Sequence, residues 1–330
     1  MRPFKLEWQI EKRKYSLDLG SETLIMGILN TTPDSFSDGG QYFKFDDAVT
    51  QGLKLVDEGA DILDIGGESS RPFAEPVSVQ EELDRVLPVI ERLSNQIDIP
   101  ISIDTVKFEV AKEALNAGAS IINDITALEK GGRMAQLASD KGVPVILMHM
   151  KGTPTTMQLN PQYDDFLNEI ISYLKDRANF AISSGISPKN IILDPGIGFG
   201  KTVEHNLMVI KYLHKIGELG FPTLVGPSRK SFIQRILASK LDQSKFSSND
   251  DKLTLDDKTL NAKNIKPLSK DKMLNTKIIK ALSKETEAGT MGAVAASIMN
   301  GANIVRVHDV ASAKAVATII NAVQSVKAID

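Results

Sequence analysis

Short runs of aliphatic and β-branched residues alternate along the chain with longer segments of helical period. Segments such as Glu81 to Leu93 place an apolar residue at every third or fourth position, which indicates a helix with one buried face. Strands that alternate with helices in this way are typical of a parallel sheet covered by helices. The pattern predicts eight strands, at residues 24–29, 61–65, 100–103, 120–122, 143–148, 190–193, 223–225 and 303–307.

Eight strand–helix repeats predict an α/β fold of the closed (β/α)8 barrel type. Several predicted helices stop at a glycine before the next strand, at Gly59, Gly118, Gly142 and Gly185, where a left-handed residue can turn the chain. The alternative is an open doubly wound sheet, which usually has fewer strands and a glycine-rich dinucleotide loop after the first. Because barrels of roughly 250 residues fold as one unit, we expect a single domain over residues 1–330.

Two segments depart from the repeat. Residues 4–19 predict a β-hairpin ahead of the first barrel strand, covering the barrel floor. Residues from about 240 to 276 are rich in Lys, Asp, Asn and Ser, with only scattered hydrophobic residues. Such a composition buries too little apolar surface to offset the entropy of ordering. It predicts a mobile polar insertion on the surface between strands seven and eight.

Composition and charge exclude several classes of function. The formal net charge is -3 and no basic tract is interleaved with aromatic residues, which argues against a nucleic-acid partner. The chain has no cysteine, so disulfides, thiolate metal sites and a cysteine nucleophile are excluded. The chain has no long apolar run that would predict a membrane span or a secretory leader. We therefore expect a cytoplasmic protein with small-molecule partners.

Chemically reactive or polar residues follow every predicted strand. In a barrel, the active site lies at the carboxyl ends of the strands, so these residues are candidates for one shared site. Asp64 could instead tie down the second loop, and His149, between two methionines, could be structural. Strand alternation lets only one of Asn123 and Asp124 face the barrel axis. In strand order, the candidates are Asn30, Asp64, Asp104, Asn123, His149, Asp194, Lys230 and Arg306.

The loops after strands seven and eight predict an anion site. Residues 228–231, Ser-Arg-Lys-Ser, open a predicted helix, whose first N–H groups favour an anion. Arg306 and His308 lie two apart on strand eight and point the same way, and Arg71 belongs to loop two. A pyrophosphate group with Mg²⁺ fits this set, because Mg²⁺ uses one or two protein ligands plus phosphate oxygens and water.

Two other features of the strand ends narrow the range of ligands that the site could bind. The glycine-rich stretch 196–202 lacks the spacing of a Walker A motif and of GxGxxG, so it is no nucleotide loop. Asp104, Asn123 and Asp194 are polar groups facing an apolar barrel, which is costly unless a ligand supplies donors. A 2-amino-4-oxo pyrimidine such as a pterin would do so, as would other amidine-like heterocycles.

The same residues lie in eight motifs that resemble the dihydropteroate synthases. Two are long signature loops, MGILNTTPDSFSDGG at residues 26–40 and DIGGESSRP at residues 64–72. The others are IDT (103–105), IND (122–124), MHM (148–150), LDPGIGFGK (193–201), GPSRKSF (226–232) and VRVHDV (305–310). The resemblance covers nearly the whole chain, in order, apart from the insertion.

The resemblance implies a usually dimeric barrel that condenses 6-hydroxymethyl-7,8-dihydropterin pyrophosphate with p-aminobenzoate and is inhibited competitively by sulfonamides. It implies that the pterin is bound by Asp104, Asn123, Met148, Asp194, Gly226 and Lys230. It places pyrophosphate near Asn30, Arg71, Arg306 and His308, with Asn30 also holding Mg²⁺. It places p-aminobenzoate near Phe36, Ser70, Pro72, Phe199 and Ser231. Catalysis is then assigned to Asp104, Lys230, Arg306 and His308.

Three departures from the family pattern and two alternative functions remain open at this point. Ser70 stands where the family usually has threonine and keeps the hydroxyl, and Thr31 stands where valine is common. Phe73 stands where glycine is frequent, which leaves the p-aminobenzoate and sulfonamide affinity open. A pterin-binding methyltransferase would share the acidic residues but would have no use for a pyrophosphate clamp. A non-catalytic pterin-binding module would be expected to lose loop residues such as Asn30, Arg71 and Lys230, which this chain keeps.

Overall fold

Eight parallel strands form a closed barrel in the computed structural model, which describes residues 4–20, 22–32, 41–69, 75–153, 157, 161–245 and 272–326. Hydrogen bonding runs in the order β8-β7-β6-β5-β4-β3-β10-β9. A parallel bridge from Leu193 to Thr223 joins β8 to the start of β9 and closes the barrel. The open-sheet alternative is therefore wrong. The barrel strands are β3 (Leu24–Asn30), β4 (Ile62–Gly66), β5 (Ile101–Asp104), β6 (Ile121–Asp124), β7 (Val145–Met148), β8 (Ile191–Asp194), β9 (Leu224–Val225) and β10 (Ile304–Val307).

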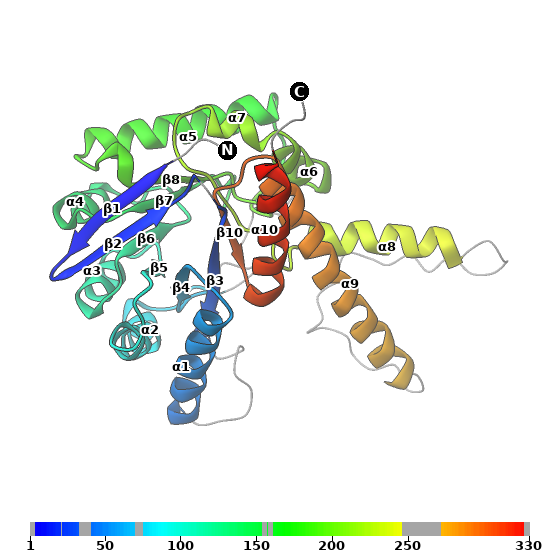
Figure 1. The fold of residues 1–330 in the computed structure, drawn as a ribbon, viewed down its shortest axis with the longest axis horizontal. Coiled ribbons are helices and arrows are strands. Elements are labelled where there is room, and N and C mark those ends of the chain that lie inside the picture. Colours follow the sequence, from blue (N-terminus) through cyan, green and yellow to red (C-terminus); the bar gives the residue numbers. More distant parts are fainter. Residues whose placement is uncertain are drawn as a thin grey trace.

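The strands lie within two residues of their predicted positions because short apolar runs mark them clearly. Every residue of β4, β6, β7 and β8 is buried, as expected for strands covered on both faces. Figure 1 shows helices arranged around this sheet. They are α1 (Gln41–Asp57), α2 (Val79–Ser94), α3 (Phe108–Ala117), α4 (Gly132–Lys141), α5 (Phe166–Ser183), α6 (Val203–Lys211), α7 (Leu213–Gly217), α8 (Ser231–Lys245), α9 (Lys272–Met299) and α10 (Val310–Ser325).

Helix α2 illustrates how the sequence specifies these helices. The Ser78 hydroxyl accepts a hydrogen bond from the backbone N–H of Glu81 and caps the first turn. Val86, Ile90 and Leu93 are fully buried, so the predicted apolar stripe faces the barrel. The predicted glycines at positions 59, 118, 142 and 185 all have positive φ and turn the chain toward the next strand. No helix of the described ranges is both long and apolar enough to cross a membrane.

The predicted hairpin is formed by β1 (Lys5–Ile10) and β2 (Arg13–Asp18), which pair antiparallel. Its alternate residues are buried, and Trp8 stacks on Tyr15 with ring centroids 5.2 Å apart. Strand β1 packs against the short 3-10 helix η2 (Pro188–Asn190), which directly precedes β8. The hairpin therefore covers the amino end of the barrel and leaves the carboxyl ends of the strands free for a site.

The edges of the predicted insertion are helical, which corrects the expected boundaries. Helix α8 continues to Lys245 and α9 begins at Lys272, so residues 240–245 and 272–276 belong to helices. Helix propagation needs only one backbone hydrogen bond per residue, so a polar sequence can extend a helix that is anchored elsewhere. In Figure 1 both helices extend beyond the edge of the barrel. Residues 246–271, and with them the expected mobility, lie outside the described residues.

Candidate active site

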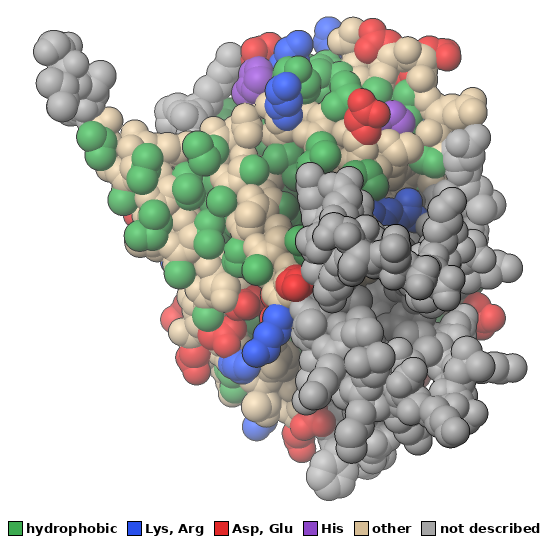
Figure 2. All heavy atoms as spheres, turned by 90° about the vertical axis from the view of Figure 1, so that its right-hand side faces the viewer, with side chains coloured by type: hydrophobic (Ala, Val, Ile, Leu, Met, Phe, Trp, Pro, Cys, Tyr) green, Lys and Arg blue, Asp and Glu red, His purple; other side chains and the backbone are tan. Residues whose placement is uncertain are grey.

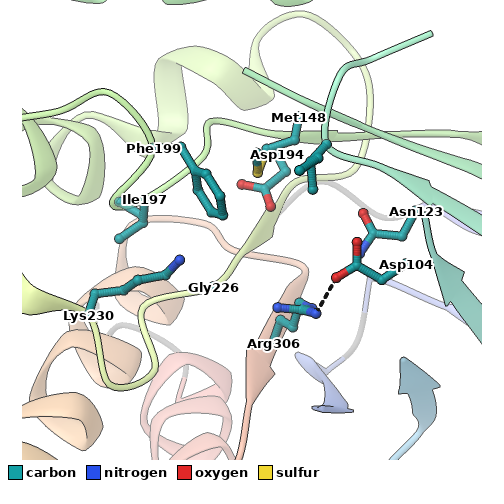
Figure 3. A pocket seen from close by; sticks show the side chains of 10 residues that line it. Asp104, Asn123, Met148, Asp194, Ile197, Phe199, Gly226, Lys230 and Arg306 are labelled. Atoms are coloured by element: carbon teal, nitrogen blue, oxygen red, sulfur yellow. Dashed lines mark hydrogen bonds and ion pairs between the residues drawn. The ribbon is translucent and has the colours of Figure 1, made fainter. Parts of the chain in front are cut away.

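A pocket lies at the carboxyl ends of the barrel strands (Figure 3). Sequence analysis had singled out all of its lining residues except Ile125 and Ile197, whose apolar side chains carry no chemical signal. Ile125 directly follows the end of β6, which is a signal that could have found it, whereas Ile197 lies three residues after the end of β8. The lining residues are Asp104, Asn123, Ile125, Met148, Asp194, Ile197, Phe199, Gly226, Lys230 and Arg306.

Arg306 joins two carboxylates across the pocket floor. Its Nε donates to Asp64 Oδ2 at 2.6 Å, and its terminal nitrogen donates to Asp104 Oδ2 at 2.8 Å. Asn123 Nδ2 donates to the same Asp64 oxygen at 3.1 Å. Asp64 is fully buried in the middle of β4, so the idea that it ties down loop two is wrong. The protein itself thus supplies a donor to the Asp104 carboxylate.

Asp194 is the second buried carboxyl of the pocket. Its Oδ1 accepts a hydrogen bond from the Gly196 backbone N–H at 2.7 Å, which turns the loop after β8. Burial is the largest influence and raises the pKa of Asp194 to about 6, against the smaller opposing effect of the Gly196 hydrogen bond. Burial also raises the pKa of Asp104, against the opposing field of Arg306. Both carboxyls are thus costly to ionise until a ligand donates hydrogen bonds to them.

Lys230 and Phe199 form one wall of the pocket. The Lys230 ammonium lies 4.0 Å from the centroid of the Phe199 ring, a cation–π contact. A Cβ at position 198 would lie 2.9 Å from Lys230 Cδ, so glycine there leaves room for the lysine stem. Met148 and Met157 pack with Phe199 in a small apolar cluster behind this wall. The wall therefore combines a positive charge with a flat apolar surface.

A strained turn presents Lys230 to the pocket. The preceding residue, Arg229, has a φ of 56°, a left-handed conformation that is uncommon for a residue other than glycine. Helix α9 holds this turn, because Thr290 Oγ1 accepts from the Arg229 backbone N–H at 3.3 Å and Glu287 pairs with its guanidinium at 3.2 Å. Sequence reasoning missed the positioning role of Arg229, since the partners on α9 are about sixty positions away.

Asn30, Ser231 and His308 lie at the same end of the barrel as the pocket but do not line it. Asn30 ends β3 and Ser231 begins α8, whose N-terminus faces the same end of the barrel. Ser228 Oγ and His308 Nδ1 lie 2.9 Å apart, so the loops after the last two strands meet as predicted. Four further candidates, Phe36, Ser70, Arg71 and Pro72, lie outside the described residues.

His149 and Asp124 point away from the pocket. Burial, and secondarily the charge of Lys201, lowers the pKa of His149 to about 2, so the ring stays neutral. Asp124 accepts hydrogen bonds from the backbone N–H groups of Thr126 and Leu128, which confirms that Asn123 alone faces the axis. Within the described ranges, no three His, Cys, Asp or Glu side chains gather as metal ligands.

Comparison with known proteins places this site in a family. The sequence pattern of the family of pterin binding enzymes matches residues 26–308, which is most of the chain. The chain belongs to the pterin binding enzyme family. It is 49% identical over 220 residues to the dihydropteroate synthase of Synechocystis, an alignment that covers 67% of this chain and 76% of that protein.

Two solved structures share the fold closely. Dihydropteroate synthase of Xanthomonas albilineans, solved with 4-aminobenzoic acid, superposes with a TM-score of 0.78 at 37% identity and covers 98% of this chain and 100% of its own. The Yersinia pestis dihydropteroate synthase, solved in a sulfonamide complex, gives 0.78 at 35% identity with the same coverage. The fold, including the barrel and its amino-terminal hairpin, is thus that of these enzymes.

Proposed function

We propose that the protein is a dihydropteroate synthase, a transferase of folate biosynthesis that joins 6-hydroxymethyl-7,8-dihydropterin pyrophosphate to p-aminobenzoate and releases pyrophosphate. The observation that carries the proposal is the pocket itself. Buried acidic and amide groups line one side, where Arg306 pairs with Asp104, and Lys230 lies across the pocket (Figure 3). The relatives named dihydropteroate synthase support the same assignment.

The acidic side of the pocket fits the pterin ring. A pterin presents its ring N–H and amino group as parallel donors, and Asp194, 6% exposed at the end of β8, can accept them. Asp104 and Asn123 lie side by side in register on β5 and β6, so they can bind the other edge of the ring. Donors from the ligand replace lost water around these carboxylates, which is the condition for burying them at low cost.

Arg306 links the two halves of the substrate. Its Nε stays on fully buried Asp64, while its terminal nitrogen is shared with Asp104 at the pocket surface. When the pterin donates to Asp104, that nitrogen is free to turn to the pyrophosphate. Binding therefore exchanges one ion pair for another and leaves neither carboxylate unpaired.

The chemical step we propose is cleavage of the C–O bond to give a pterin methyl cation, which the arylamine nitrogen of p-aminobenzoate then captures. Lys230, Arg306 and His308 stabilise the negative charge that develops on pyrophosphate, and Asp104 and Asp194 stabilise the cation. A neutral arylamine needs no strong general base before attack. Phe199 offers a flat apolar face for its ring, and the N-terminus of α8 at Ser231 attracts its carboxylate.

The residues present fit Mg²⁺ as a cofactor. The amide oxygen of Asn30, half-buried at the end of β3, is a hard oxygen ligand of the kind that Mg²⁺ prefers. A site with one protein ligand suits an ion whose other ligands are pyrophosphate oxygens and water. When bound, Mg²⁺ would neutralise charge on the leaving group.

We also propose a homodimer in the cytoplasm. Ile319 and Val323 lie four residues apart on α10 and Val326 directly follows its end, and each exposes more than 60% of its surface. Figure 2 shows hydrophobic side chains gathered on this face. A second copy of the chain is the partner that a self-complementary apolar face fits. Changing Val323 to Glu should halve the mass in solution, and an unchanged mass would contradict a dimer on this face.

The decisive test of the activity is pyrophosphate release from purified protein. We expect release only when the pterin pyrophosphate, p-aminobenzoate and Mg²⁺ are all present, with competitive inhibition by a sulfonamide against p-aminobenzoate. Methyl transfer from a folate without pyrophosphate release would favour a methyltransferase. Pterin binding without any turnover would favour a non-catalytic module.

A further inference from the structure

Lys201 is a buried lysine that the proposed reaction does not use. It lies in the glycine-rich stretch 196–202, and only 3% of its surface is exposed. Its ammonium lies 2.9 Å from His149 Nδ1, 3.1 Å from the carbonyl oxygen of Phe199 and 3.4 Å from that of His149. Each of these three contacts is to a neutral acceptor. Burial lowers the pKa of Lys201 to about 7, so keeping this side chain inside the protein is costly.

The contacts of Lys201 join two loops that approach unusually closely. A Cβ at Gly196 would lie 2.0 Å from the His149 carbonyl oxygen, and one at Gly200 would lie 2.4 Å from that of Lys151. Both glycines have positive φ. Glycine permits this approach, but it also gives the loop backbone more freedom than any other residue would. Side chains must therefore fix the loop.

Two donors fix adjacent carbonyl groups of this loop. Lys201 Nζ donates to the carbonyl oxygen of Phe199, and the Tyr163 hydroxyl donates to that of Gly200 at 2.7 Å. The Phe199 ring lies in the pocket wall beside Lys230 (Figure 3). The orientation of that ring thus depends on where its own backbone is held.

We propose that Lys201 and Tyr163 are positioning residues, which hold the Phe199 ring where it packs against p-aminobenzoate and against Lys230. The inference rests on the proposed function and names the substrate half that these residues serve. Displacement of a substrate-contacting group by about 1 Å can cost on the order of 100-fold in rate, so a residue beneath the wall can matter as much as one in it. The pterin half contacts β5, β6 and β8 and should not depend on them.

The test compares Lys201→Met with two other variants. Methionine keeps an unbranched stem but has no donor, so we expect the KM for p-aminobenzoate to rise at least tenfold. The Kd of the pterin pyrophosphate, measured by calorimetry, should stay within threefold of wild type. Tyr163→Phe removes only one hydroxyl and should shift the same KM in the same direction, by threefold or more. Lys211→Met makes the same chemical change at an exposed site on α6 and should shift neither value.

A second measurement does not depend on activity. A fluorine label on the ring at position 199 should give one sharp ¹⁹F resonance in wild type and in Lys211→Met, but a shifted or broadened one in Lys201→Met. An unchanged p-aminobenzoate KM in folded Lys201→Met, or equal weakening of both substrates, would overturn the inference. Should Lys201→Met fail to fold, an unchanged KM in Tyr163→Phe would overturn it. Absence of turnover in wild type would instead overturn the proposed function, and the ¹⁹F comparison would still test the positioning.

Discussion

At the scale of single residues, the buried charged side chains of the pocket differ in the partners that balance their charge. Arg306 has two carboxylate partners, whereas Asp194 has a backbone N–H and only more distant cations. Removing a charge from these positions should therefore have different consequences for stability and for binding.

Asp194→Asn should stabilise the free protein while abolishing tight pterin binding. Because burial raises the pKa of Asp194 from 3.8 to about 6, the folded state binds more protons than the unfolded state between those values. Wild-type stability therefore falls as pH rises through this window, by about 3 kcal/mol at most. Asparagine does not titrate, so the melting-temperature advantage of the variant should grow from pH 4 to pH 6 and then level off.

Calorimetry with the pterin, alongside the control Asp124→Asn, checks the binding half of this prediction. Asp124 is a buried carboxyl turned away from the pocket, so its variant should keep pterin affinity. Wild-type affinity in Asp194→Asn would remove Asp194 from the pterin site.

Lys230→Ala and Arg306→Ala should both lose turnover but should differ in stability. Both cations face the developing charge of the leaving group, so each loss should lower the rate by about 100-fold to 1000-fold. Arg306→Ala also leaves Asp64 and Asp104 without their partner, at a cost of about 3–5 kcal/mol. Rates of pyrophosphate release and urea unfolding curves separate these effects. Near-normal turnover of Lys230→Ala would place the leaving group elsewhere.

At the scale of the elements, glycines at helix ends set how closely neighbouring helices approach. Gly118 ends α3 with a φ of 118°, and a Cβ there would lie 2.5 Å from both Cβ and Oγ of Ser94 on α2. Gly142 ends α4 with a φ of 64°, and nothing lies within 4 Å of its Cβ position. The two glycines share a conformational role but differ in packing.

Gly118→Ala should therefore destabilise the protein more than Gly142→Ala. The left-handed backbone alone costs an alanine about 1–2 kcal/mol, which is the loss expected at position 142. Overlap with Ser94 adds about 1–3 kcal/mol at position 118. Urea unfolding of the matched pair measures the difference. Equal losses would mean that α2 moves aside without cost.

At the scale of the whole molecule, helices α8 and α9, which lie between β9 and β10, reach from the site to beyond the edge of the barrel (Figure 1). The two helices pack on each other. Helix α8 begins at Ser231, and α9 carries Glu287 and Thr290. The contacts that hold the Lys230 turn come from Glu287 and Thr290 of α9.

Replacing residues 246–271 by a Gly/Ser linker of similar reach should leave turnover unchanged. Loop closure costs only about 0.6 kcal/mol per doubling of length, so the longer natural connection needs no catalytic explanation. Turnover, mass in solution and melting temperature test this together, because assembly could change while chemistry does not. A folded deletion variant that binds both substrates but has lost turnover would assign the segment a catalytic role.

The sequence by itself determined the strand positions, the helix ends and most of the pocket lining. These features are encoded locally, because an apolar run of strand length, a terminal glycine or a polar strand end can be identified from neighbouring residues. Residues such as Asp104, Asn123 and Asp194 were found because barrel topology brings all strand ends to one face.

Only the tertiary structure decided how those groups are paired. Arg306 meets Asp64 and Asp104 across separations of 242 and 202 positions, and no local pattern encodes that choice. The direction of the His149 ring and the burial of Lys201 depend likewise on which side chains converge behind the pocket. Charge balance, desolvation and contact distance are properties of the assembled barrel, because each is set by groups that meet only after folding.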